Sequence, residues 1–504
     1  MCLSLASELR FIELKKSCAV IGSGVAGLAT AIRMAVAGYQ VTVFEANDKP
    51  GGKMSEFNLS GFRFDKGPTV LTKPEYLDDL FRFAGKEPRD YWNCKKVDPI
   101  FNYYFEDGTL IRSHSDWAKF ANEVAEKTSD SGKNLVGFLE KAKVKHDLTD
   151  EVFLQRSLHK FRNYLNWETL KGVVNFHKIE AFRSMNASNQ AHFNDQKLVD
   201  IFNRYASYNG SDPYLAPATL NVISHYEITT GTYFSEGGIY SIVSALYKLA
   251  LELKVDFRFD SAVRELTFMN DEITGVVSDK GAEKFDVVIS NVDVHRFYTN
   301  LVPKHRESNR FLKQERSSSV IVFYWGLDCQ FGQLGLHNMF LTVDSEAEYK
   351  HIRQGRLFED PTIHLTISSK GNSNDAPEGC ENWAVLISTP HNTDQNWDEL
   401  IEVSRKRVLA KLQRILNVDV SSHITVESVQ DPRTLETETG AAYGAVFGSS
   451  SNSMLSAFMR HPNFSSRYKN LFFCGGTVHP GPGVPLCLLS AKIATEMAVN
   501  SKEA

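Results

Sequence analysis

The stretch that decides the fold is Cys18-Ala19-Val20-Ile21-Gly22-Ser23-Gly24-Val25-Ala26-Gly27. It opens with a short apolar run, which is typical of a buried parallel strand. After it, apolar residues recur at helical spacing, at Leu28, Ala31, Ile32, Ala35 and Val36. A second β-branched run covers residues 41–44 and ends at Glu45. The pattern therefore predicts a strand, a glycine turn, a helix and a second strand that ends in an acid.

Each part of this pattern has a physical role in binding a dinucleotide. Gly22 allows the tight turn, Gly24 lets the backbone approach a pyrophosphate, and Gly27 lets helix and strand pack closely. The helix N-terminus supplies unpaired N–H groups and the positive end of the helix dipole for the phosphates. Glu45 can accept hydrogen bonds from a ribose hydroxyl. The stretch predicts a dinucleotide site in a Rossmann-type α/β unit. The alternative is a Rossmann unit that has lost its ligand.

The choice between nucleotides depends on the residues that follow. Glu45 disfavours NADP because its carboxylate would repel a 2′-phosphate. Spacing alone does not separate FAD from NAD. However, Gly51-Gly52-Lys53 comes after the acid, and it resembles the segment that runs back beneath the cofactor in FAD enzymes of the glutathione-reductase type. This resemblance implies FAD.

Length and composition are those of a globular protein. The chain has 504 residues, so we expect two domains. A hydrophobic content of 42% and a charged content of 23% are ordinary. The formal net charge of −5 gives no electrostatic reason to expect nucleic acid as a partner.

The cysteines and the hydropathy of the chain indicate the cellular compartment in which we expect the protein. The seven cysteines are scattered, with no CxxC pair and no metal-ligand spacing, so we expect reduced thiols in a cytoplasmic protein without a metal. Glu8, Arg10 and Glu13 interrupt any signal-peptide core. No uninterrupted apolar stretch is long enough to span a bilayer. We expect a protein that is soluble or lies on a membrane surface.

Residues 158–183 combine basic side chains with interleaved aromatic and aliphatic ones. Such a stretch can lie on a lipid surface. The alternative is an ordinary solvated helical face over a core, and the stretch alone does not decide between them.

The C-terminal region repeats the pattern of strand and glycine turn. Apolar residues 471–474 precede Gly475 and Gly476, and a helical pattern covers residues 486–499. A second glycine turn at a helix N-terminus would supply further N–H groups to a phosphate or ribityl chain. The alternative is a simple connection between strand and helix.

Together these motifs resemble the bacterial carotenoid desaturases, flavoenzymes of the phytoene desaturase type. The matching stretches span nearly the whole chain: residues 20–27, 44–53, 61–69, 205–221, 236–243, 287–293 and 470–494. Residues 476–490 are most similar to the hydroxycarotenoid 3,4-desaturase branch. Two residues depart from the family pattern, Pro482 where glycine is usual and Lys66 where a small or apolar residue is common.

The resemblance implies a discontinuous α/β architecture. A Rossmann-type, glutathione-reductase-like FAD domain would comprise residues 1–84, 222–300 and 455–504. An inserted α+β substrate domain, with a helical region that touches the membrane, would comprise residues 85–221 and 301–454. The segment 255–291 would complete the nucleotide sheet, and Val263 would meet the adenine through its backbone. The expected FAD contacts are Gly22, Gly24, Val25, Ala26, Gly27, Glu45, Ala46, Gly51, Gly52, Lys53, Gly67, Pro68, Thr69, Val263, Asn291, Gly475, Gly476, Val484 and Pro485.

The implied activity is FAD-dependent formation of a C=C bond in a carotenoid, with oxygen or a quinone as the electron acceptor. No side chain is a strong two-electron acceptor, so the cofactor must supply that step. Glu227 and His225 are the candidate catalytic bases, and His479 lies in the expected flavin-side loop. The alternative for all three is a structural role.

Other functions share this architecture. A phytoene desaturase and a carotenoid oxygenase or isomerase would differ mainly in the length and end shape of the substrate tunnel. An amine oxidase would need an aromatic cage beside the flavin. A non-enzymatic isoprenoid-binding escort protein would not need Gly51-Gly52-Lys53 or the Gly475-Gly476 loop, and this chain has both.

Overall fold

The glycine turn lies at the centre of a five-stranded parallel sheet with the order β19-β13-β1-β2-β9. The computed structural model describes residues 16–160, 175–302 and 309–501. The strands of the sheet are β1 (Ser17–Ile21), β2 (Gln40–Phe44), β9 (Asp256–Arg258), β13 (Val287–Ser290) and β19 (Leu471–Phe473). Each segment expected to form the FAD domain contributes to this sheet. The domain boundaries themselves stay a prediction.

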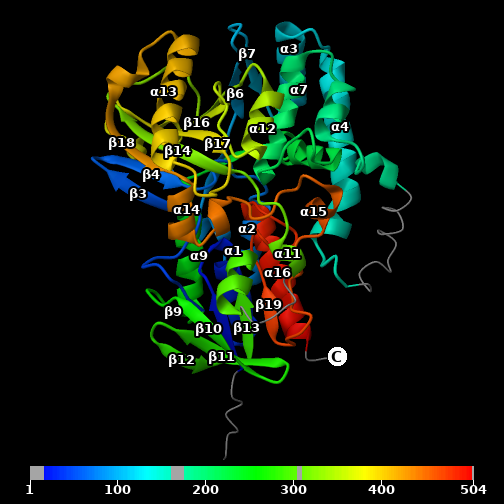
Figure 1. The fold of residues 1–504 in the computed structure, drawn as a ribbon, viewed down its shortest axis with the longest axis vertical. Helices are drawn as coiled ribbons and strands as arrows, with labels where there is room; N and C mark the ends of the chain where they lie inside the picture. The colour runs from blue at the N-terminus through cyan, green and yellow to red at the C-terminus, as the bar shows by residue number, and fades with distance from the viewer. Residues whose placement is uncertain (1–15, 161–174, 303–308, 502–504) are drawn as a thin grey trace, which may run out of the picture.

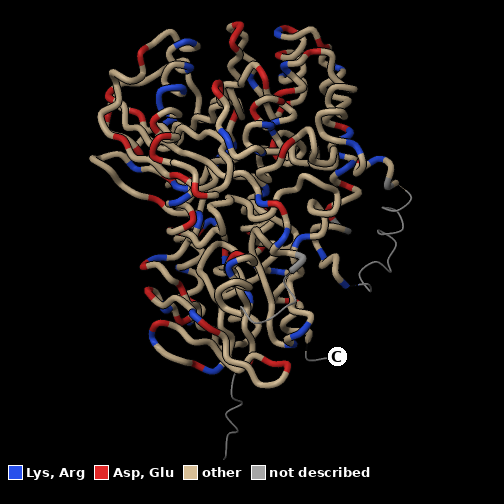
Figure 2. Tube along the Cα trace, in the orientation of Figure 1, with Lys and Arg blue, Asp and Glu red and all other residues tan. Residues whose placement is uncertain are grey.

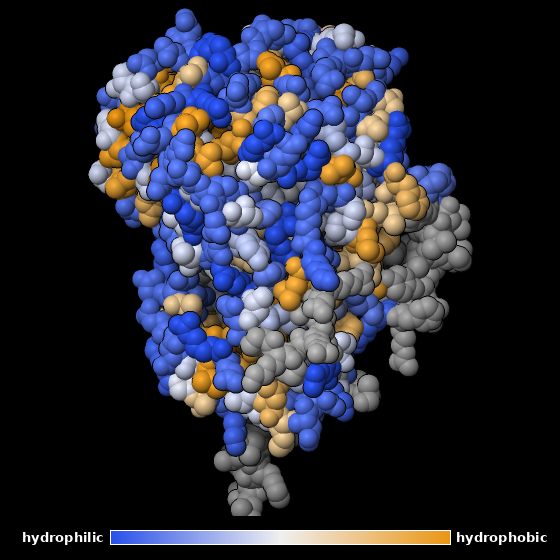
Figure 3. Space-filling view, in the orientation of Figure 1, coloured by the Kyte–Doolittle hydropathy of each residue, from blue (hydrophilic) through white to orange (hydrophobic). Residues whose placement is uncertain are grey.

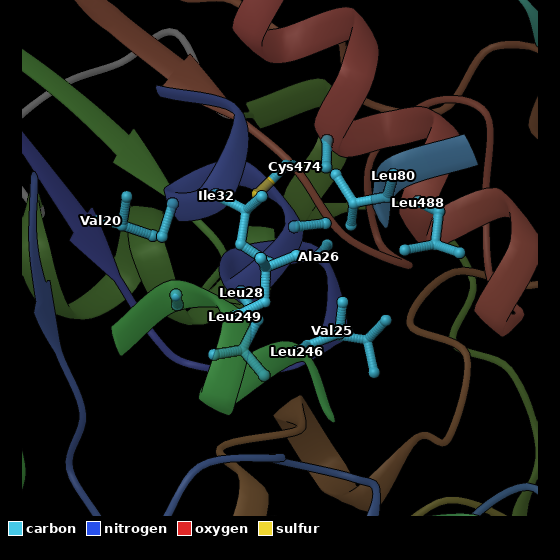
Figure 4. Close-up of a cluster of buried hydrophobic side chains, with 14 of the residues drawn as sticks. Val20, Val25, Ala26, Leu28, Ile32, Leu80, Leu246, Leu249, Cys474 and Leu488 are labelled. Carbon is cyan, nitrogen blue, oxygen red and sulfur yellow. The ribbon is translucent and has the colours of Figure 1, made fainter. Parts of the chain in front are cut away.

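Three helices form an apolar layer on this sheet. They are α1 (Val25–Val36), α9 (Tyr240–Glu252) and α16 (Val484–Asn500). Leu28 and Ile32 of α1 are fully buried, and they lie among side chains of α9 and α16 (Figure 4). Because α1 carries several alanines on its buried faces, neighbouring helices can approach it closely. This packing places the N-termini of α1 and α16 on the same side of the sheet as the cofactor loops (Figure 1).

The segment 255–291 is only partly in the nucleotide sheet, which corrects the expectation from the sequence. β9 and β13 join it, whereas a separate antiparallel sheet is formed by β10 (Val263–Met269), β11 (Glu272–Ser278) and β12 (Gly281–Lys284). Strand propensity predicts that these residues are extended, but it does not identify their partners.

A seven-stranded sheet forms the other half of the molecule, in the upper part of Figure 1. Its order is β18-β14-β17-β16-β15-β6-β7. The strands are β6 (Phe101–Tyr104), β7 (Leu110–Ser113), β14 (Ser319–Leu327), β15 (His337–Phe340), β16 (Ile363–Ile367), β17 (Glu381–Thr389) and β18 (Ile424–Gln430).

The two faces of this sheet have different partners because side chains alternate along a strand. Phe323, Trp325 and Trp383 pack with helix α13 (Trp397–Leu416) in one core cluster. Val322 and Tyr324 point to the opposite face, where they meet the hairpin of β3 (Ser55–Leu59) and β4 (Phe62–Lys66). This second face is directed toward the cofactor half of the molecule.

Helices cover the end of the seven-stranded sheet near β6 and β7. They are α3 (Trp117–Lys127), α4 (Gly132–Thr149), α6 (Met185–Gln190) and α7 (Gln196–Asn203). A short antiparallel pair, β5 (Cys94–Lys96) with β8 (Tyr233–Ser235), joins segments assigned from the sequence to different domains. Basic and acidic residues are interspersed over both halves (Figure 2). Among the described residues, no helix combines the length and the apolar character needed to cross a bilayer.

We predict that Leu365→Ala in β16 lowers the free energy of unfolding by about 2–5 kcal/mol, because it removes fully buried methyl groups and leaves a cavity. Leu251→Ala is the matched control, since Leu251 is 47% exposed, and it should change stability by less than about 0.5 kcal/mol. Urea-induced unfolding followed by circular dichroism measures both. Equal effects of the two substitutions would contradict this assignment of the core.

Candidate active site

The glycine turn between β1 and α1 requires a residue without a side chain at one position in particular. A Cβ atom on Gly27 would lie 2.0 Å from the carbonyl oxygen of Gly22. The backbone of the helix therefore approaches the end of β1 more closely than any other residue would permit. As a consequence, Gly22, Gly24 and the first residues of α1 line a cavity, with the N-terminus of the helix at its wall.

Glu45, directly after β2, is fixed at the same wall. Its Oε2 atom accepts hydrogen bonds from the N–H (2.8 Å) and the hydroxyl (2.6 Å) of Ser23. Its Oε1 atom accepts from the N–H (3.0 Å) and the side-chain amide (3.1 Å) of Asn47. The side chain is only 6% exposed. This arrangement fixes the Glu45 carboxylate at the wall of the cavity.

The segment after Glu45 runs beneath the glycine turn. The N–H of Gly51 donates to the carbonyl oxygen of Ser23 (3.0 Å), and Gly51 forms an isolated bridge with Gly24. Gly67 follows β4 with φ of +118°, and a Cβ atom there would lie 2.2 Å from the carbonyl oxygen of Lys53. Three chain segments thus meet through their backbones, and a glycine from each of them, Gly24, Gly51 and Gly67, lines the cavity.

The C-terminal loop completes this set of backbones. Asn291 lies between the two glycine loops, because its Nδ2 atom would be 3.3 Å from a Cβ atom on Gly24 and 3.4 Å from one on Gly475.

His479 is buried, its Nε2 atom is 2.9 Å from the carbonyl oxygen of Arg156, and burial lowers its pKa to about 4. Lys66, one of the two departures from the family pattern, pairs with the carboxylate of Glu438 at 2.9 Å.

A cavity of about 1100 Å³ connects these loops with the seven-stranded sheet. Of the residues predicted as cofactor contacts, only Gly27 does not line it. The predicted residues that do are Gly22, Gly24, Val25, Ala26, Glu45, Ala46, Gly51, Gly52, Lys53, Gly67, Pro68, Thr69, Val263, Asn291, Gly475, Gly476, Val484 and Pro485. Their roles toward a cofactor stay predictions.

Two cations at the cavity wall form no salt bridge among the described residues. Arg460 is 2% exposed, and its guanidinium donates to the carbonyl oxygens of Phe447, Ser449 and Gly476. Burial lowers its pKa to about 10. Lys53 is half-buried and donates to the carbonyl oxygen of Val446 at 2.6 Å; loss of hydration lowers its pKa, and the carboxylate of Asp293 opposes that shift. A buried cation without a counter-charge is costly, so the surroundings of Arg460 fit an anionic group such as a diphosphate.

The sequence predicted Lys53 but not Arg460. No motif marks Arg460, since its partners are backbone carbonyls and the hydroxyl of Ser451. Its burial depends on loops that come together only in the folded protein, so the sequence does not reveal it.

The two candidate bases have different surroundings. Glu227 lines the cavity, is 1% exposed, and accepts hydrogen bonds from Arg204, Tyr205 and Tyr208. His225 packs beside His146 with ring centroids 4.6 Å apart, and it is not among the described residues that line the cavity. Burial lowers the pKa of His225 to about 4. The catalytic role of either residue stays a prediction, and the geometry favours neither as an isolated base.

The part of the cavity beyond the glycine loops is largely apolar. One wall is the face of the seven-stranded sheet that includes Val320, Val322 and Leu386. The opposite wall includes Phe153 and Leu154, and it also includes Phe458 from helix α15 (Met454–Phe458). Such walls exclude water and suit a long hydrocarbon.

Outside the cavity, the structure brings together three potential metal ligands that the sequence did not predict. Each of the three residues offers one ligand atom, and these atoms all lie within 4.8 Å of one another; the residues are Asp328, Cys329 and His423. Asp328 is exposed, and exposed acidic groups often cluster without an ion. This grouping does not by itself identify a metal site.

We predict that Gly27→Ala lowers the affinity for FAD by at least about tenfold, equivalent to about 1.4 kcal/mol, because the new methyl group must push α1 away from β1. Gly137→Ala in α4 is the matched control, since its Cβ atom would lie 3.9 Å from the nearest atom, Cε1 of His192. Flavin absorbance relative to protein absorbance measures retention after purification. Wild-type flavin content in Gly27→Ala would contradict the proposed close approach.

Comparison with known proteins agrees with this geometry. The chain is 41% identical to a 1-hydroxycarotenoid 3,4-desaturase from Flavobacterium sp. (strain P99-3), over 96% of this chain and 99% of that protein. It is 30% identical to a phytoene desaturase from Fusarium fujikuroi, over 97% of this chain and 90% of the relative.

Structural comparison gives the same fold at low identity. Wild-type putrescine oxidase bound to putrescine superposes with a TM-score of 0.65 at 14% identity, covering 97% of this chain and 100% of that one. The family profile for flavin-containing amine oxidoreductases matches residues 25–497. The chain therefore belongs to the family of flavin-containing amine oxidoreductases.

Proposed function

We propose that this FAD-dependent oxidoreductase is a carotenoid desaturase of the 1-hydroxycarotenoid 3,4-desaturase type. The observation that carries the proposal is one continuous cavity, which has the glycine loops at one end and apolar walls at the other. The identity of 41% to such an enzyme over nearly the whole chain supports the same substrate class.

In this proposal, the chain's residues hold FAD along the edge of the five-stranded sheet. Glu45 accepts the ribose hydroxyls, and Val263 meets the adenine through its backbone. The N-terminus of α1 and the side chain of Lys53 neutralise the diphosphate. The loops at Gly67–Thr69, Gly475–Gly476 and Val484–Pro485 contact the flavin end. When bound, FAD supplies a two-electron acceptor for hydrogen removed from a C–C bond.

The apolar walls position the substrate. A rigid polyene that lies along the sheet face at Val320, Val322 and Leu386 can present only a short part of its length to the flavin end. The tightly packed walls exclude water from that region, which protects a developing cationic carbon from side reactions. We propose that Glu227 positions groups around the substrate and that neither it nor His225 is required as a free base. We propose oxygen or a quinone as the final electron acceptor.

Anaerobic incubation of the holoenzyme with a terminally hydroxylated acyclic or monocyclic carotene tests this function. We expect the flavin absorbance to bleach and the product to show a red shift that corresponds to one added double bond. Bleaching with phytoene instead would favour a phytoene desaturase, and an oxygen-containing product, detected by mass spectrometry, would favour an oxygenase. A protein that binds no FAD would overturn the proposal.

We also propose that the protein is cytoplasmic and binds a membrane peripherally. The six cysteines within the described residues are all free, as expected in a reducing compartment. An exposed apolar patch comprises Phe182, Leu215, Met454 and Leu455, with exposed fractions of 81%, 47%, 37% and 56%. Hydrophobic atoms gather at the height of α15 on the right of the molecule (Figures 1 and 3).

One part of the patch lies beside the cavity. Phe458 of α15 lines the cavity and also packs against the cluster of Leu148, Ile179 and Ala181, and Ala181 directly precedes Phe182. An isolated bridge between Ser184 and Pro217, and a hydrogen bond from the N–H of Asp212 to the side chain of Asn452 (2.8 Å), connect the chain segments that carry the four patch residues. A carotenoid dissolved in a bilayer would thus meet the protein beside the cavity.

We predict that Phe182→Ser combined with Leu455→Ser lowers binding to liposomes by about tenfold, because each exposed side chain contributes apolar area on insertion. Met269→Ser is the control, since Met269 is 63% exposed at the end of β10, which lies in the lower part of Figure 1, away from α15. Co-sedimentation of holoenzyme with liposomes measures the effect. Equal losses for the control and the double variant would contradict the location of the patch.

A further inference from the structure

A charged and polar cluster interrupts the apolar wall of the cavity. The guanidinium of Arg204 donates to the carboxylate of Glu227, to the hydroxyl of Tyr103 (2.8 Å) and to the hydroxyl of Tyr208 (3.3 Å). Glu227 also accepts hydrogen bonds from Tyr205 (2.7 Å) and from Tyr208. An ion pair in a cavity for a hydrocarbon is costly to bury, so its presence calls for a function.

Aromatic rings hold the guanidinium rigidly. The Cζ atom of Arg204 lies 4.4 Å from the ring centroid of Phe101, 5.2 Å from that of Tyr103, 4.3 Å from that of Tyr205 and 5.5 Å from that of Tyr208. These distances are in the range of cation–π contacts. The cluster is therefore preorganised.

The cluster has one side toward the cavity and one side toward the core. Arg204, Tyr208 and Glu227 line the cavity. Tyr103 and Tyr205 are fully buried behind them and do not line it. The same carboxylate thus accepts from a phenol at the cavity wall and from a phenol in the core.

His364 of β16 extends this polar wall. It lines the cavity, and its Nε2 atom lies 3.4 Å from the hydroxyl of Thr366. Its Nδ1 atom has no hydrogen-bond partner among the described residues. Burial holds the pKa of His364 well below its ordinary value, so the ring is neutral and can donate from one nitrogen and accept at the other.

The cluster has hydrogen-bonding capacity that the protein does not use. A guanidinium has five N–H donors, and the described residues accept three hydrogen bonds from Arg204. A hydrocarbon cannot use the remaining donors, whereas a hydroxyl group can both accept from Arg204 and donate to Tyr208 or His364.

The cluster lies close to the expected flavin end of the cavity. Tyr208 is two residues before Gly210, and a Cβ atom on Gly210 would lie 2.8 Å from Cδ2 of Phe447. Arg460 donates hydrogen bonds to the carbonyl oxygens of both Phe447 and Gly476, and Gly476 is one of the expected flavin contacts. In a 1-hydroxy substrate, the carbon that bears the hydroxyl is two C–C bonds from the nearer carbon of the 3,4 bond. A group that binds this hydroxyl must therefore lie near the flavin rather than at the remote end of the cavity.

We propose that Arg204, Tyr208, Glu227 and His364 form the binding site for the terminal hydroxyl of the carotenoid. This proposal rests on the proposed desaturase function and deepens it. By binding the hydroxyl, the cluster sets which C–C bond lies at the flavin end, so it determines substrate choice and bond position without taking part in the hydrogen removal.

The test compares two substrates that differ only in the terminal hydroxyl. For wild-type holoenzyme, we expect a higher kcat/KM for the hydroxylated carotene. Tyr208→Phe should lower the ratio of the two kcat/KM values by at least about tenfold, mainly through KM of the hydroxylated substrate, because it removes a hydrogen-bonding group from a charged site. His364→Phe, which retains an aromatic ring, should also lower the ratio.

Tyr205→Phe is the matched control. It removes a hydrogen bond to the same carboxylate from the core side, so it should lower stability while the substrate ratio stays at the wild-type value. Anaerobic titration of each holoenzyme with the hydroxylated carotene, after the flavin has been reduced with dithionite, gives the affinity independently of turnover, because the reduced flavin cannot accept electrons from the substrate. We expect the affinity to fall for Tyr208→Phe and not for Tyr205→Phe.

The outcomes separate this proposal from the function on which it rests. If wild-type enzyme converts both carotenes with equal kcat/KM, the desaturase assignment holds and the hydroxyl site is wrong. If it converts neither, the proposed function fails and the hydroxyl site fails with it. If Tyr205→Phe lowers the ratio as much as Tyr208→Phe, or if both cavity-side variants retain the wild-type ratio, the cluster is structural.

Discussion

The close approach between α1 and β1 is the constraint on which the rest of the structure depends. Because Gly27 has no side chain, the helix can start within contact of the Gly22 carbonyl, and its N-terminus reaches the cavity. The Gly51 segment then bonds to this turn, and the C-terminal loop meets it through Asn291. The segments that carry Glu45, Lys53 and Gly475 therefore all meet at this one turn.

The sequence predicts local elements well because their signals lie within a few residues. The strand, turn and helix at residues 18–36 occur as expected, and the helix expected at residues 486–499 is α16 (Val484–Asn500). Pairing is less predictable, since the strands β10 to β12 have the expected extended character but form their own sheet. The pairing of β5 with β8 joins residues more than a hundred positions apart, and no local pattern signals it.

The same distinction applies to the site. Backbone-built parts were predictable, because glycines at fixed spacing mark where a chain must pass close to a ligand. Side-chain parts were not. The burial of Arg460 could not be predicted, because the carbonyl groups that accept its hydrogen bonds belong to other loops of the chain. The sequence identified Glu227 as a candidate base, but it did not predict the hydrogen bonds that this carboxylate accepts from Arg204 and two tyrosines on another segment.

The position of β19 in the five-stranded sheet has a consequence for the order of folding. β13 pairs with both β1 and β19, so the sheet brings together residues 17–21, 287–290 and 471–473, and α16 follows β19 and packs on α1. Contacts between residues so far apart in the sequence form slowly. We therefore expect the turn between β1 and α1 to lack these neighbours early in folding, and the apolar face of α1 to be open to aggregation until β19 and α16 dock.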